Sequence, residues 1–388
     1  MKVRTHDLVI HGASGFTGRL VAEYLSDTAD PALRWALSGR DLDKLAAVRD
    51  AIGAPDTLPL IRADADDPES LAALAVSTRL VLTTVGPYQL YGSGLVAACA
   101  AAGTDYVDLC GEPAWMRMMI DAHNAEAQAS GARILFSCGF DSIPFDLGVL
   151  MLQQAAQRRF GKPAQRVKGR VVKMKGGASG GTLASMRATM AAAAKSLDVL
   201  RLMKDPFALT PGFEGPHQPS GLIPEYDVDA GVWAVPFVMA TINTKNVHRT
   251  NALLGHPWGT DFAYDEMLYT TLGEAAKAAA EAIAKANPFG DSPLKPGEGP
   301  DKAARDAGFY EVCFLGRTAA GNDLRLTVMG DRDPGYGSTS RMITETALCL
   351  LDDGADVAAG IATPGAALGA KLAERLQARA GLRFTEEG

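Results

Sequence analysis

Short apolar runs alternate with amphipathic segments along the first 140 residues. The first run, Leu8–Ile10, leads into a glycine-rich stretch and then into apolar residues at helical spacing, which predicts a strand, a tight turn and a helix. The same order recurs after runs at 34–38, 58–61, 80–85, 106–109 and 134–138. Because parallel strands need helical crossovers, six such units predict a Rossmann-type doubly wound parallel sheet, an α/β fold.

The pattern changes near Asp141. Residues 166–175 alternate basic and apolar side chains over part of their length, which predicts a half-exposed strand, and Val232–Ile242 reads as another strand. Phe309–Arg317 and Leu324–Gly330 are separated by a short turn segment, which predicts a hairpin. Mixed strands and helices indicate a second, α+β domain.

Three stretches complete the organisation. Residues 205–231 are rich in proline and glycine and predict a long loop, whereas 265–285 show an alanine-rich helical pattern. Helices over 340–351 and from Thr363 onward close the chain and are expected to pack back on the first domain. The predicted division is a cofactor-binding domain over 1–140, a substrate domain over 141–337 with an insertion at 205–300, and C-terminal helices over 338–388.

Composition narrows the function class. The formal net charge of −7 and the scattered basic residues argue against a nucleic-acid partner. Five cysteines without paired spacing suit reduced thiols, and no apolar run approaches a membrane span, so we expect a cytoplasmic protein. The 265–285 segment could cover the crevice or dock on a lipid surface, and plain packing is the favoured interpretation. A homodimer is left open, and no residue spacing suggests a metal site.

The glycine-rich stretch after the first strand carries the main chemical signal. Gly12, Gly15 and Gly18 recur every three residues between a strand and a helix. Glycines let the backbone approach a pyrophosphate, whose charge is stabilised by the amides and dipole at the helix N-terminus. The alternative is an ordinary β–α turn. Since ligands of doubly wound sheets bind at the strand C-termini, one crevice should be lined by Gly12, Ser38, Asp64, Gly86, Gly111 and Gly139.

The second strand indicates which dinucleotide binds. NAD sites usually place a carboxylate about 20 residues after the glycines, but here Ser38 stands at that position and Arg40 follows it. A guanidinium suits a 2′-phosphate, so the predicted cofactor is NADPH, with Lys44 as a second cation. Solvated loop cations are the alternative for both. The expected cofactor-binding residues are Gly12, Ser14, Gly15, Phe16, Thr17, Gly18, Ser38, Arg40, Lys44, Asp64, Val85, Gly86 and Pro87.

Several motifs together resemble the saccharopine dehydrogenase-like superfamily. They lie at residues 12–18, 38–40, 85–92, 106–112 and 139–146, and those at 175–182, 331–336 and 363–366 are similar to trans-acting enoyl reductases. The resemblance covers nearly the whole chain. It implies NADP-dependent reduction of an enoyl double bond on a polyketide or fatty-acyl chain, in lipid or glycolipid assembly and apart from the synthase. Where family members carry a markedly apolar stretch, this chain has the milder 265–285 segment, which weakens the expectation of contact with the inner face of the plasma membrane.

Enoyl reduction needs a group that stabilises the thioester oxygen and a source of a proton. Tyr88, at the tip of the fourth strand, is the first donor candidate, and Lys175 of the second domain is the next. Tyr88 could instead pack against the cofactor ring, and Lys175 could lie on the solvent-exposed face of its strand. Asp108 and Glu112 could cap loops or hold ribose hydroxyls, and capping is the favoured interpretation. Asp141 with Ser142 is interpreted as fixing the junction between domains.

Two other functions stay open. A reductase that acts on an imine joining amino acids would need convergent arginines, for which Arg170, Arg187 and Arg249 are available. The other is a non-catalytic, lipid-associated protein that binds NADPH. The expected partner in the favoured case is a small-molecule or acyl-carrier-bound lipid substrate.

Overall fold

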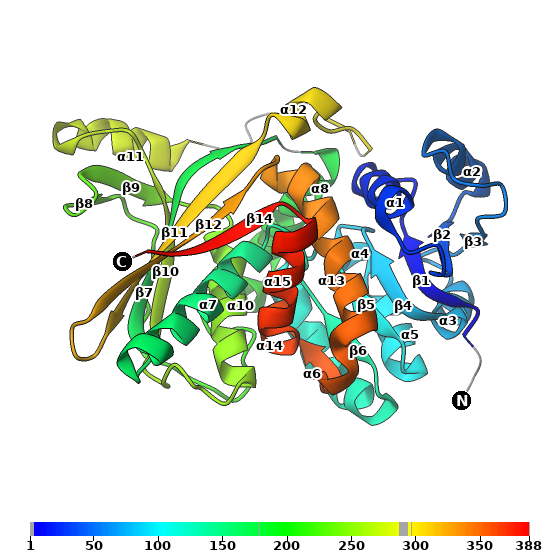
Figure 1. The fold of residues 1–388 in the computed structure, drawn as a ribbon, viewed down its shortest axis with the longest axis horizontal. Helices are drawn as coiled ribbons and strands as arrows, with labels where there is room; N and C mark the ends of the chain where they lie inside the picture. Colours follow the sequence, from blue (N-terminus) through cyan, green and yellow to red (C-terminus); the bar gives the residue numbers. More distant parts are fainter. Residues whose placement is uncertain (1–3, 178, 287–293, 296, 388) are drawn as a thin grey trace.

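The computed structural model describes residues 4–177, 179–286, 294–295 and 297–387. Two sheets organise this part of the chain, one in each half of the molecule (Figure 1). The first has seven strands in the order β13-β6-β5-β4-β1-β2-β3, and all its pairings are parallel. Its strands are β1 (His6–His11), β2 (Trp35–Gly39), β3 (Leu60–Arg62), β4 (Thr78–Thr83), β5 (Asp105–Val107), β6 (Arg133–Leu135) and β13 (Gly360–Ala362). The doubly wound prediction is confirmed.

Helices cover both faces of this sheet, and the apolar strands reflect it. Leu8 and Ile10 are buried in one core cluster and Val9 in the other, so alternate residues of β1 contact opposite layers. The first layer holds α1 (Phe16–Thr28), α2 (Leu42–Ala51) and α13 (Thr339–Asp353). The second holds α3 (Pro68–Ser77), α5 (Ser93–Ala102) and α6 (Pro113–Ser130).

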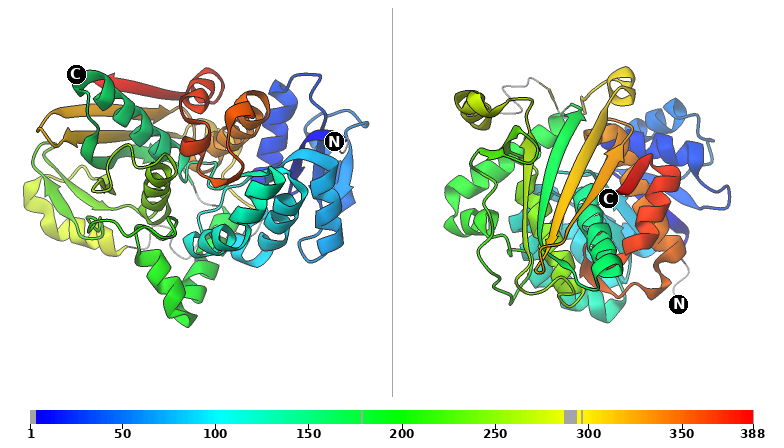
Figure 2. Two further views of the ribbon diagram at one scale, coloured as in Figure 1. Left: turned by 90° about the horizontal axis from the view of Figure 1, so that it is seen from below. Right: turned by 60° about the vertical axis from the view of Figure 1, so that its left-hand side comes forward.

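The second sheet is mixed, as its pattern predicted. Its order is β14-β12-β11-β7-β10-β9-β8, in which only β7 and β10 pair in parallel. The strands are β7 (Ala164–Lys175), β8 (Glu225–Asp227), β9 (Val232–Pro236), β10 (Ala263–Tyr269), β11 (Phe309–Thr318), β12 (Asp323–Gly330) and β14 (Leu382–Glu387). The hairpin of β11 and β12 is confirmed. Helix α7 (Ile143–Phe160) contacts both of these strands, and α10 (Ala240–Leu253) lies against α7 and β10 (Figure 2).

Three predicted elements were wrong in part. Strand β7 is flanked by β11 and β10, and Arg170 in its middle is fully buried because Asp265 and Glu225 neutralise it. The strand expected over 232–242 ends at Pro236, and Ile242 belongs to α10. The expected helix over 265–285 begins as strand β10, because its first residues extend the ladder between β7 and β9. Only α11 (Lys277–Lys285), after a short 3-10 turn η1 (Glu274–Ala276), is helical.

The last 50 residues contribute to both halves. Helix α13 packs on α1, where Tyr24 donates a hydrogen bond to Glu345 at 2.8 Å, and β13 extends the first sheet. After α14 (Pro364–Ala367) and α15 (Gly369–Arg379), β14 pairs with β12 of the second sheet. The helix α13 packs back on the first domain as expected, and the sequence pattern missed the two strands β13 and β14. Within the described residues, no helix is long and apolar enough to cross a bilayer.

Candidate active site at the carboxyl edge of the parallel sheet

The glycine-rich loop packs so closely that side chains are excluded at two of its positions. Gly12 has φ +85°, and a Cβ there would lie 2.6 Å from Cγ2 of Val85. A Cβ on Gly18 would lie 2.2 Å from the carbonyl oxygen of Gly12, so α1 sits directly against the end of β1. Gly15 precedes α1, and no side chain of the described residues caps the helix. The amides of its first turn are therefore available to an anion, as a pyrophosphate cradle requires.

Two arginines line one depression at the C-terminal ends of β2 and β3. Arg40 follows β2, and Arg62 ends β3 in register with Gly39. Both line a depression of about 530 Å³ with Asp41, Leu42 and Asp43. Neither guanidinium has a hydrogen bond or ion pair to any described residue. The sequence interpretation missed Arg62, which directly follows the strand predicted over 58–61, because the sequence does not show that this strand lies beside β2.

The other residues expected near the ribose are buried or already have protein partners. Ser38 is fully buried, and its hydroxyl lies 3.1 Å from Nδ1 of His11. Burial lowers the pKa of His11 to about 4, so this imidazole is a neutral packed group. Lys44 is exposed and its ammonium lies 3.6 Å from Asp41, which also caps α2. Asp64 follows β3 and accepts the amide of Asp66 at 3.2 Å.

Helix α8 (Gly180–Lys195) of the second half packs on the segment that follows β4. A Cβ on Gly86 would lie 3.4 Å from the hydroxyl of Ser185, and Gln89 donates to Thr189 at 3.2 Å. At the other end of α8, the hydroxyls of Thr182 and Tyr336 are 2.7 Å apart. The Tyr336 ring in turn contacts Phe16 of the glycine-rich loop, with the centroids 5.1 Å apart. The second half thus contacts the nucleotide half at the loop of Val85–Pro87 and at Phe16, which are among the residues expected to hold the dinucleotide.

Tyr88 lies beneath this loop, in short helix α4 (Tyr88–Tyr91), with little exposure. Its hydroxyl donates to the carbonyl of Thr83 at 3.4 Å and accepts the amide of Leu109 at 3.1 Å. Burial raises the pKa of Tyr88 well above its ordinary value. These bonds favour the packing interpretation over the donor one.

Lys175 is exposed at the end of β7, beside Phe309, and has no ion pair among the described residues. Two residues later the amide of Gly177 donates to Asp333 at 3.1 Å, which fixes the turn that leads into α8. Lys175 is therefore near the crevice but is not held in one orientation by protein partners.

The predicted capping roles are confirmed. Glu112 accepts the amides of Tyr88 and Gln89 at 2.9 and 2.8 Å, at the start of α4. Asp108 accepts the amides of Cys110 and Ser137 at 2.9 and 3.0 Å. Burial raises the pKa of Asp108 to about 7. No group of three His, Cys, Asp or Glu residues within the described ranges is placed to hold a metal ion.

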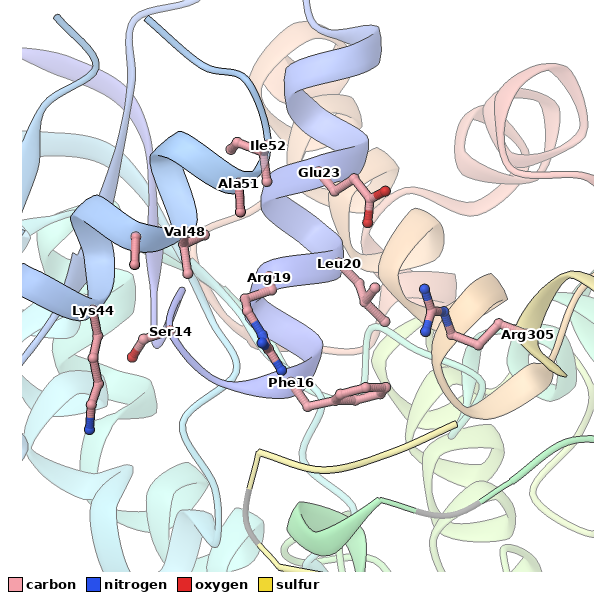
Figure 3. A pocket seen from close by; sticks show the side chains of 11 residues that line it. Ser14, Phe16, Arg19, Leu20, Glu23, Lys44, Val48, Ala51, Ile52 and Arg305 are labelled. Carbon is pink, nitrogen blue, oxygen red and sulfur yellow. The ribbon is translucent and has the colours of Figure 1, made fainter. Parts of the chain in front are cut away.

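A separate groove runs between α1 and α2. It has a volume of about 580 Å³ and is drawn in Figure 3. Its floor is apolar, and Arg19, Lys44 and Arg305 place positive charge around it. Ser14 and Phe16 line the groove as well, so it adjoins the glycine-rich loop.

The similarity to known proteins fits this geometry. Residues 8–135, which build β1 to β6, match the family model of the saccharopine dehydrogenase NADP binding domain. A Mycobacterium tuberculosis protein provisionally named a trans-acting enoyl reductase is 40% identical, over 97% of this chain and 96% of its own. The Mycobacterium ulcerans trans-acting enoyl reductase is 37% identical, with 96% of each chain covered. This chain belongs to the trans-acting enoyl reductases of the saccharopine dehydrogenase-like superfamily.

A solved structure has a similar overall fold. The saccharopine dehydrogenase (L-Glu forming) of Saccharomyces cerevisiae superposes with a TM-score of 0.58, over 99% of this chain and all of its own, at 13% identity. The family assignment makes this chain an NADP-dependent oxidoreductase with NADPH as cofactor. The described residues fit that cofactor, because no side chain caps the first amides of α1 and two guanidinium groups line the depression at the ends of β2 and β3.

Proposed function

We propose that this chain reduces the enoyl double bond of an acyl or polyketide thioester in lipid or glycolipid biosynthesis, acting apart from the synthase. Bound NADPH would supply the hydride. The chain itself would hold the nucleotide at Gly12–Gly18 and at Arg40, and would enclose the acyl group between the loop of Gly86 and helix α8. The substrate would be a small thioester or an acyl chain on a carrier.

The observation that carries this proposal is similarity over the full length. Relatives named as enoyl reductases cover 96% or more of this chain, which includes the second sheet as well as the nucleotide domain. Nucleotide domains are shared by many chemistries, whereas the second half forms the substrate side of the crevice. Similarity that extends through both halves therefore supports the enoyl reaction more strongly than the nucleotide motif alone.

The arginines considered for an imine substrate give that alternative little support. Arg170 bonds to Asp265 at 2.8 Å and to Glu225 at 2.9 Å. Arg249 donates to the carbonyls of Leu209 and Ile361 and is 5% exposed. A substrate carboxylate would have to displace these partners, so at least two of the three candidates are committed to the fold.

The experiment that tests the proposal follows NADPH oxidation with enoyl-CoA thioesters of increasing chain length. NADH in place of NADPH is the control for the nucleotide, and a glutamate–aldehyde mixture is the control for imine reduction. We expect oxidation with NADPH and enoyl thioesters only. Tight NADPH binding without oxidation of any substrate would instead support the non-catalytic alternative.

Location and assembly also remain proposals. We expect a cytoplasmic enzyme, with α11 as the segment to test for contact with the inner face of the membrane, since Ile283 on it is 44% exposed. Partition into anionic vesicles with and without Ile283→Asp would test that contact. Sedimentation of the purified chain would test the homodimer.

A further inference from the structure

A cluster of buried polar side chains lies beside the crevice, where the two halves meet. Asp141 and Ser142 follow β6 and precede α7, at the same carboxyl edge as Gly86. Ser142 accepts a hydrogen bond from Asn246 of α10 at 2.8 Å. One turn earlier on the same helix, Asn243 donates to Glu266 of β10 at 2.9 Å. Helix α10 thus connects the loop of Asp141 to the second sheet.

Three oxygens of this cluster lack a hydrogen-bond donor. Oδ1 of Asp141, of Asn243 and of Asn246 are all buried without a partner in the described structure. Asn243 and Asn246 are 0% and 1% exposed, so water does not reach them freely. Buried acceptors without partners are costly and occur mainly at functional sites. Asp141 differs from both asparagines because the residue as a whole is only half-buried.

The charges around Asp141 favour its neutral form. Burial raises the pKa of Asp141 to about 7. Burial also raises the pKa of Glu266 to about 8, with the negative charge of Asp141 adding to the effect. The other ionisable groups that face this cluster are Tyr264 of β10, which donates to Glu266 at 2.9 Å, and Arg170 of β7. Arg170 is already paired with Asp265, so it is not available as a free cation to the Asp141 carboxylate.

We propose that Asp141 is the proton donor of the enoyl reduction. The inference rests on the function proposed above. Bound NADPH would supply the hydride that adds to Cβ of the substrate, so the π electrons would move onto Cα and the thioester oxygen. The O–H bond of Asp141 then breaks as a C–H bond forms at Cα, which leaves a saturated thioester, NADP⁺ and the Asp141 carboxylate. Because Asp141 is partly exposed, solvent can return its proton after product release.

The primary test is Asp141→Asn, which keeps the shape of the neutral acid but has no acidic proton. We expect kcat with an enoyl-CoA to fall by about a hundredfold or more, the range of a lost general acid, while the NADPH dissociation constant is unchanged. In the unaltered enzyme, kcat should decline as pH rises past about 7, because the neutral acid is then depleted. That alkaline limb should disappear in the variant.

Asp146→Asn is the matched control. Asp146 is a buried carboxyl five positions further on whose pKa burial also raises to about 7, but it bonds to Thr250 at 2.5 Å and to the amide of Gly365 at 2.8 Å. We expect its variant to keep both kcat and the alkaline limb. Equal turnover and the same limb in Asp141→Asn would overturn the assignment of the proton donor.

An activity-independent measurement separates this proposal from the function itself. Infrared difference spectra between the unaltered chain and Asp141→Asn should show a carboxylic-acid carbonyl band that titrates near pH 7. If no enoyl thioester is reduced but the band is present, the proposed function fails while the protonated state of Asp141 stands. If reduction occurs and the band is absent at neutral pH, the proton-donor proposal fails alone.

Discussion

Arg62 ends β3 directly beside Gly39, so its side chain enters the same depression as Arg40. The two cations come from neighbouring parallel strands, and neither has a protein partner among the described residues. Two guanidinium groups at the neighbouring ends of β2 and β3 are suited to bind a dianion, and a 2′-phosphate carries that charge. We therefore expect the preference for NADPH to depend on a pair of arginines, of which the motif after β2 reveals only one.

Arg62→Ala should weaken NADPH binding to a degree comparable with Arg40→Ala. Each charge-assisted bond contributes about 1.5–3 kcal/mol, which corresponds to about a tenfold to hundredfold rise in the dissociation constant. Affinity for NADH should change little, because NADH lacks the phosphate. Calorimetric titration of both variants with both nucleotides is the measurement, and a parallel loss of NADH affinity would remove the phosphate role. Arg49→Ala, on the far end of α2 and bonded to the carbonyl of Asp56, is the control.

The elements of the nucleotide-binding half could be predicted well because each is determined by residues that are close together in the sequence. Glycines, apolar runs and the cap at Asp41 each specify their own strand, turn or helix, and the parallel order follows from the crossovers. Arg62 was missed because its relevance depends on which strand lies beside β2. That neighbour relation is a property of the sheet, and no local pattern contains it.

Gly18→Ala should disrupt the docking of α1 on β1. The added Cβ would lie 2.2 Å from the carbonyl oxygen of Gly12 and 2.9 Å from Cα of Ala13, and these backbone atoms cannot move aside as a flexible side chain could. We expect a loss of about 1–3 kcal/mol in the free energy of unfolding, the usual cost of overpacking, together with weaker NADPH binding. Gly273→Ala is the control, since its Cβ would meet nothing within 4 Å and its φ is −74°. Urea unfolding would reveal the difference, and equal stabilities would show that the loop tolerates the side chain.

The second half of the chain was harder to predict, because its structure depends on contacts between residues far apart in the sequence. Arg170 looks like a surface residue in the sequence, but Asp265, 95 positions away, makes its burial tolerable. Met267 and Leu268 fit a helical pattern as well as a strand, and only pairing with β7 and β9 decides between them. The buried positions of α10 are largely polar. An apolar stripe therefore does not predict the helix that carries Asn243 and Asn246.

Tyr88→Phe should act on stability more than on catalysis. The hydroxyl bridges Thr83 and Leu109, so its removal leaves a buried carbonyl and a buried amide short of one partner. We expect a loss of about 0.5–1.5 kcal/mol in the free energy of unfolding, unchanged NADPH affinity and near-normal kcat. Lys175→Met would serve as the companion variant for the second donor candidate. A large fall in kcat for Tyr88→Phe, beyond what its stability explains, would restore the donor role to the hydroxyl.

Asp146 should make the protein less stable as pH rises from about 4 to about 7. Its folded pKa of about 7 lies above the unfolded value, so in this window the native state keeps a proton that the unfolded chain has released. The free energy of unfolding therefore falls with pH, by at most about 1.4 kcal/mol per pH unit from this one group, and levels off above the folded pKa. Asp146→Asn cannot titrate, so its stability should fall less steeply than that of the unaltered chain over the same window. Urea unfolding at several pH values gives both curves, and if they run parallel, Asp146 is ionised in the folded protein and the environment provided by Thr250 and Gly365 stabilises its charge.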